Sequence, residues 1–153
     1  MTGKIEELQI DIGVMLDRMI PAEYKTAYVF YELGTGVAPS FWFCYIDAES
    51  GKIIPADGIE ERKDIVINNL SEFKNSRSKL IYDVQQLQKA YIAEYGREWF
   101  GITYKLNDDG RFDIEFDYDK PTGSLQERRE KWCMKHLGQM PPKVTVDMLM
   151  SHN

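Results

Sequence analysis

Apolar and acidic residues alternate regularly in the segment that follows Asn107. The apolar positions are Phe112, Ile114, Phe116 and Tyr118, and the acidic positions are Asp113, Glu115, Asp117 and Asp119. Successive side chains of a strand point to opposite faces, so this pattern predicts a strand over 111–118. One face of the strand is expected to join the core, and the other is a row of negative charge.

The N-terminal half of the chain predicts a helix followed by three strands. Apolar residues recur at steps of three and four over 5–19, which is typical of an amphipathic helix, and Pro21 is expected to end it. Two segments rich in aromatic and β-branched residues follow at 28–31 and 41–46, and a turn with a short third strand occupies 47–54. We therefore predict an antiparallel meander. The odd-numbered and the even-numbered residues of the second strand are all apolar, so this strand is expected to be covered on both faces.

The segment 59–95 is charged and has helical periodicity. We predict two helices there, divided at 75–78, with Gly96 ending the second. A strand over 99–106 and a hairpin turn at 107–110 then lead into the acidic strand.

A capping box predicts the start of the last helix. Ser124 and Glu127 have the spacing at which a hydroxyl and a carboxylate satisfy each other's backbone N–H groups. Gly138, followed by two prolines, is expected to end this helix. Residues 139–153 are interpreted as a C-terminal extension.

These elements together predict an α+β fold. We expect one domain over 1–153, with an antiparallel sheet of about five strands and N-terminal, central and C-terminal helices packed mainly on one face. The aromatic residues expected to be largely buried are Trp99, Phe112, Phe116 and Trp132.

Composition points to an acidic cytoplasmic protein. The net charge of −6 and the pI near 5.0 argue against nucleic-acid binding, since such proteins need a basic surface to displace counterions. The N-terminus resembles no signal peptide, and no apolar run approaches the roughly 18–20 residues that span a bilayer. Cys44 and Cys133 are interpreted as buried structural thiols in a reducing compartment.

The sequence offers little catalytic chemistry. His136 and His152 belong to no metal-ligand spacing, and Gly34-Thr35-Gly36 lacks the Lys-Ser/Thr continuation of a phosphate loop. No catalytic residue, cofactor or metal site is predicted. The acidic row has three interpretations, which are a solvated face, contact with a partner, and a metal site that the spacing of alternate strand residues disfavours.

Several segments together resemble the YezG-like immunity (antitoxin) proteins. They are Met19-Ile20-Pro21 with an aromatic residue at Tyr24, the strands at 28–31 and 41–45, and above all Trp99 to Gly138. This last stretch has a strand led by Trp99, a glycine turn, Phe116-Asp117-Tyr118-Asp119, and the Arg128 to Gly138 ending with Trp132. The chain departs from the family pattern at Tyr24, where Trp is usual, and at 100–103 after Trp99. Residues 139–153 extend beyond the part that resembles the family.

This resemblance implies a binding protein that is not an enzyme. The family neutralises nuclease toxins of interbacterial competition, such as contact-dependent growth inhibition. The implied partner is a cognate secreted nuclease toxin domain, basic and either an RNase or a DNase, which the protein binds in the cytoplasm. Nuclease sites present basic groups to phosphates, so an acidic inhibitor gains electrostatic steering and complementary contacts there.

We expect the toxin to contact exposed acidic residues of the last strand and of two turns. The candidates are Asp113, Glu115, Asp117, Asp119, Asp108, Asp109, Asp47 and Glu49. The loop at 34–39 and the turn at 47–51 form a competing surface. Two other functions remain open, a small carboxylate- or Cys-dependent cytosolic enzyme and a cytosolic scaffold or chaperone for another partner.

Overall fold

A five-stranded sheet in the order β3-β2-β1-β4-β5 forms the centre of the fold, and every neighbouring pair is antiparallel. The strands are β1 Tyr24–Glu32, β2 Ser40–Asp47, β3 Ile53–Pro55, β4 Gly101–Asn107 and β5 Phe112–Asp117. The structure, a computed structural model, describes residues 3–33, 39–56 and 59–140. Most of the expected loop at 34–39 and of the C-terminal extension therefore lies outside the described residues.

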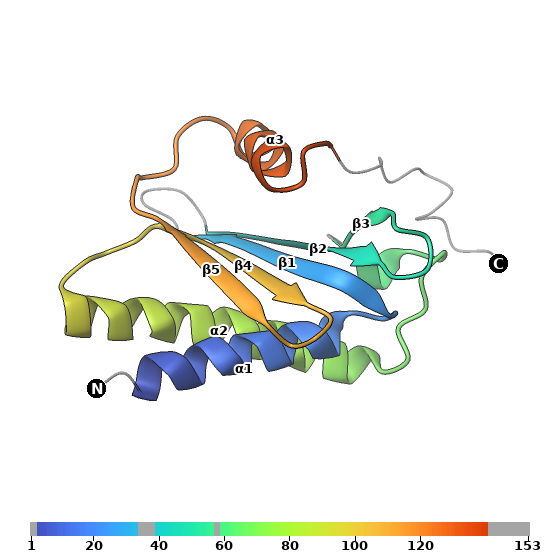
Figure 1. The fold of residues 1–153 in the computed structure, drawn as a ribbon, viewed down its shortest axis with the longest axis horizontal. Coiled ribbons are helices and arrows are strands. Elements are labelled where there is room, and N and C mark those ends of the chain that lie inside the picture. Colours follow the sequence, from blue (N-terminus) through green and yellow to red (C-terminus); the bar gives the residue numbers. More distant parts are fainter. Residues whose placement is uncertain (1–2, 34–38, 57–58, 141–153) are drawn as a thin grey trace.

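Helices cover both faces of the sheet. They are α1 Gly3–Met19, α2 Leu70–Tyr95 and α3 Leu125–His136, and a short 3-10 helix, η1, spans Ile59–Glu61. The first two lie side by side under one face, whereas α3 crosses the opposite face (Figure 1). The predicted α+β class is confirmed, with two of its three helices on one face.

Each face of the sheet has its own apolar core. The larger core lies between the sheet and the α1–α2 pair, and the smaller core lies under α3. Phe43 of β2 belongs to the larger core, and its neighbour Trp42 belongs to the smaller one. This confirms the prediction that the second strand is covered on both faces.

The central helix is continuous, so the predicted division at 75–78 is wrong. Ser76 is 4% exposed and lies between Phe73 and Leu80, which both belong to the larger core. Packing of this face against α1 and the sheet carries the helix through residues that favour turns. Gly96 ends the helix as predicted, with a φ of 67° that glycine adopts without strain.

The predicted burial of the aromatic residues is confirmed for the tryptophans only. Trp99 and Trp132 are 0% and 5% exposed. Phe112 and Phe116 pack against the larger core but are only partly buried, because β5 is an edge strand. Regular pairing in β4 begins at Gly101, two residues later than expected.

Candidate functional site

Trp132 anchors α3 on the face of the sheet opposite α1 and α2. This face is called the upper face below, and the face covered by α1 and α2 is called the lower face. Its ring stacks on Phe30 with the centroids 5.5 Å apart and meets Tyr28 and Trp42 edge-on at 5.7 and 5.3 Å. The indole Nε1 also donates a hydrogen bond to the Thr103 hydroxyl of β4 at 2.8 Å. One side chain therefore holds the helix against three strands.

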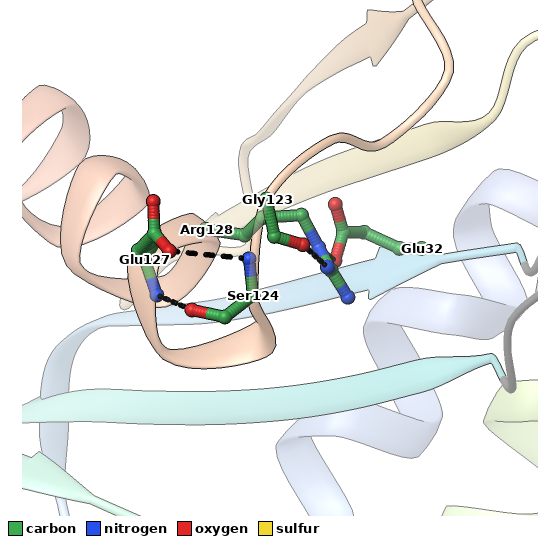
Figure 2. Close-up of polar contacts among 5 residues, drawn as sticks. All are labelled: Glu32, Gly123, Ser124, Glu127 and Arg128. Carbon is green, nitrogen blue, oxygen red and sulfur yellow. Dashed lines mark hydrogen bonds and ion pairs between the residues drawn. The ribbon is translucent and has the colours of Figure 1, made fainter.

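Polar contacts at the start of α3 fix its orientation (Figure 2). The predicted capping box is confirmed, since the Glu127 amide donates to the Ser124 hydroxyl at 3.1 Å and the Ser124 amide donates to the Glu127 carboxylate. Arg128 donates to the Gly123 carbonyl at 2.7 Å and to the carboxylate of Glu32 at 2.8 Å. Because Glu32 ends β1, this ion pair ties the helix start to the central strand.

A groove of about 410 Å³ separates α3 from the β4–β5 half of the sheet. On the helix side it is lined by cationic residues, including Arg128, Lys131 and Lys135, and on the strand side by Glu115 and Asp117. Lys135 donates to Glu115 across the groove at 2.7 Å, and this hydrogen bond holds the pKa of Glu115 below its usual value. Glu115 of the acidic strand thus has a cationic partner within its own chain.

The acidic strand residues differ in their surroundings. Asp113, Glu115 and Asp117 are all exposed on the α3 side of β5, as the alternation predicts. His136 Nε2 lies 3.7 Å from Glu115, and burial lowers the pKa of this histidine while Glu115 opposes the shift. Asp113 pairs across the ladder with Lys105. Only Glu115 of the three therefore meets cations of α3 at close range.

The remaining candidate carboxylates gather at the opposite end of the sheet from Asp117 and Asp119. The register pairs Tyr24 with Asp47 and Thr26 with Asn107, so the two turns flank the start of β1. Backbone hydrogen bonds tie both turns to that segment, from the Ala48 amide to the Glu23 carbonyl and from the Asp108 amide to the Lys25 carbonyl, each 3.0 Å long. The carboxylates placed there are Asp47, Glu49, Asp108 and Asp109.

An open hollow of about 580 Å³ lies at this turn end. Asp17, Glu23 and Asp108 line it, and Tyr24 donates a hydrogen bond to Asp17 at 2.7 Å. Sequence reasoning missed Asp17 and Glu23, because only the strand order brings the end of α1 and both turns together. Burial, with the neighbouring Asp17 adding to it, raises the pKa of Tyr24, so this hydroxyl remains a neutral donor.

The two thiols lie in the smaller core, as expected. Cys44 and Cys133 are free and buried, and burial raises the pKa of both. A nucleophilic cysteine needs the opposite shift, so neither thiol has the environment of a catalytic residue. Among the described residues, no three His, Cys, Asp or Glu side chains converge as metal ligands. Nor does the described part of the chain contain a helix long and apolar enough to cross a membrane.

The described structure thus has acidic residues exposed on β5 and at the turn end, and two thiols buried in the smaller core. Comparison with known proteins gives the class. Residues 5–149 match the family described as "Immunity protein YezG-like", so the chain belongs to the YezG-like immunity proteins. It is also 25% identical to Immunity protein YezG of Bacillus spizizenii over 152 residues, which cover 95% of this chain and 89% of that protein. The resemblance noted in the sequence is confirmed, and the family implies a cognate toxin as partner.

Proposed function

We propose that this protein binds and neutralises a cognate nuclease toxin domain during interbacterial competition, and that it acts in the cytoplasm. Membership of an immunity protein family carries the proposal. The net charge of −6 and the two acidic surfaces, on β5 and at the turn end, support a nuclease as the target. A nuclease surface that binds phosphates is basic, so opposite charges steer the two proteins together and complement each other at contact.

The β5 surface is the first choice for toxin contact, and the turn end is the second. Asp113 and Asp117 are exposed, lie on a regular strand and flank Glu115, whose carboxylate already accepts a hydrogen bond from Lys135. Asp119 lies two residues beyond Asp117, and its backbone amide donates a hydrogen bond to the Asp117 carboxylate at 3.0 Å. A strand presents such charges at regular spacing, and a basic surface of a partner can be complementary to them.

Co-expression tests the proposal. The toxin domain encoded beside this gene is produced alone and with this protein, and growth, co-purification and cleavage of RNA and DNA are measured. We expect the immunity protein to restore growth, to co-purify with the toxin domain and to suppress cleavage of one nucleic acid. A toxin domain that kills the cells despite the immunity protein, or that cleaves neither nucleic acid, would contradict it.

Charge reversal at two strand positions is expected to slow toxin association by about tenfold or more at low salt. The variant is Asp113→Lys/Asp117→Lys, which leaves the hydrogen bond between Glu115 and Lys135 in place. Its association rate, measured by stopped flow, should also depend less on salt concentration, because fewer opposite charges are screened.

A matched control separates the position of the charge from its amount. Glu61→Lys/Glu72→Lys changes the net charge equally, and both residues are exposed. They lie toward the other half of the sheet, since their neighbours Arg62 and Phe73 contact Pro55 of β3 and Phe43 of β2. This control should bind the toxin nearly as fast as the unmodified protein. Equal rates and salt slopes for both variants would move the interface away from β5.

A further inference from the structure

The outer edge of β5 is an open strand edge. The sheet ends at β5, which pairs with β4 on one side, and no strand in the described part of the chain pairs with its other side. An open edge presents a row of unpaired N–H and C=O groups, which is a template for another strand. At six residues, β5 is long enough to accept an extended segment.

The register shows which backbone groups point outward. The Asn107 amide donates to the Arg111 carbonyl at 2.8 Å, so these residues form a hydrogen-bonded pair at the base of the hairpin. Hydrogen bonding alternates along an antiparallel ladder, so Asp113 and Glu115 direct their backbone groups to β4. The N–H and C=O groups of the intervening residues point to the free edge. These are Phe112, Ile114 and Phe116.

The two faces of β5 specify the chemistry of an added strand. On the lower face, Phe112 and Phe116 pack against the larger core, but they are only partly buried because nothing extends the sheet beyond them. On the upper face, Asp113 and Asp117 are exposed. A neighbouring strand places its side chains about 4.5–5.5 Å from these residues. It would fit best with apolar residues below and Lys or Arg above.

We propose that an extended segment of the toxin domain, with apolar residues alternating with Lys or Arg, adds to β5 as a sixth strand of this sheet. The inference rests on the proposed function, because the toxin domain is the occupant. Backbone hydrogen bonds to Phe112, Ile114 and Phe116 supply the affinity, and the acidic face selects a basic strand.

The charge pattern disfavours a second copy of this chain at the same edge. Antiparallel pairing through the outward backbone groups sets the even-numbered residues of the two strands opposite each other. In every such register the odd-numbered residues also face each other, and in the register that aligns the whole strand Asp113, Glu115 and Asp117 of one copy oppose Asp117, Glu115 and Asp113 of the other. Like charges directly opposite destabilise a strand pair. The acidic face therefore disfavours self-pairing along the whole strand and suits a basic partner.

Residue-resolved amide exchange tests strand addition. Exchange is measured by NMR for the free protein and for its complex with the toxin domain encoded by the neighbouring gene. In the free protein we expect slow exchange at Asp113 and Glu115 and fast exchange at Phe112, Ile114 and Phe116. In the complex the outward amides should slow by about tenfold or more. Docking through side chains alone would leave their exchange unaltered in the saturated complex, and that result would overturn the inference.

Proline substitution gives a second test. Ile114→Pro removes an outward N–H, which an edge strand tolerates, whereas the control Ile114→Ala removes similar packing and keeps that N–H. We expect the proline variant to bind the toxin domain about tenfold more weakly than the alanine variant. Equal affinities would overturn strand addition, and if the proline variant does not fold, the exchange result decides. If the toxin domain does not bind at all, the proposed function fails. If it binds without these effects, only strand addition fails.

Discussion

Replacing Trp132 with alanine is expected to lower the free energy of unfolding by about 3–5 kcal/mol. The side chain is 5% exposed and is in ring contact with Tyr28, Phe30 and Trp42. Its removal opens a cavity under α3 and leaves the Thr103 hydroxyl without the indole donor at 2.8 Å. The midpoint of urea unfolding, followed by far-ultraviolet circular dichroism, should fall accordingly.

Two further variants identify the source of this loss. Met134→Ala removes a side chain of the same helix that is 55% exposed, and should change the free energy of unfolding by less than about 0.5 kcal/mol. Trp132→Phe keeps an aromatic ring but loses the hydrogen bond, so its effect should lie between those of the two alanine variants. An unchanged midpoint in the Trp132→Ala protein would mean that α3 is not held on the sheet by this residue.

Local signals in the sequence predicted most of the elements, because each depends on residues close together in the chain. The capping box at Ser124 is an exchange of hydrogen bonds within one helical turn, and the left-handed Gly96 needs only the absence of a Cβ. The continuity of α2 could not be predicted in this way. It depends on α1 and the sheet covering Phe73 and Leu80, which lie on either side of the turn-favouring residues.

The candidate site was predicted in part for the same reason. Alternation alone placed Asp113, Glu115 and Asp117 on one exposed face of a strand. The contact between Lys135 and Glu115 requires α3 to pack on the same face of the sheet. Trp132 places the helix there, because its ring packs among aromatic side chains of that face. The acidic turn end depends on the order of the strands. Sequence periodicity specifies which face a side chain occupies but not which elements become neighbours.

A buried carboxyl group between α1 and α2 was also not predicted from the sequence. Asp83 is 0% exposed, and Lys79 donates to it at 2.6 Å while also lying 3.3 Å from Asp11. Burial and the neighbouring Asp11 raise the pKa of Asp83 to about 6, although the hydrogen bond from Lys79 acts to lower it. The same arrangement lowers the pKa of Asp11. Below about pH 6 the proton therefore stays on Asp83, and the negative charge stays on the more exposed Asp11.

This raised pKa predicts that folding stability falls as the pH rises from about 4 to about 6 through the titration of Asp83. In that window the folded chain still holds a proton that the unfolded chain has released, since the ordinary pKa is 3.8. Above the window the ionised group is buried at a cost. Asp83→Asn supplies a neutral side chain of the same shape whose amide can donate to Asp11. We expect this variant to exceed the unmodified protein in free energy of unfolding by about 1–3 kcal/mol at pH 8.

The difference between Asp83→Asn and the unmodified protein should shrink as the pH falls, because the buried side chain at position 83 is then neutral in both folded proteins. Urea unfolding of the two proteins at pH 4.5 and at pH 8 measures it, and the comparison cancels groups that titrate alike in both chains. Asp119→Asn is the matched control, since it makes the same chemical change at an exposed position, and it should alter the free energy of unfolding by less than about 0.5 kcal/mol at either pH. If Asp83→Asn is instead less stable at pH 8 than the unmodified protein, then the ionised Asp83 stabilises the contact between α1 and α2 through Lys79, and burial of its charge carries no net cost.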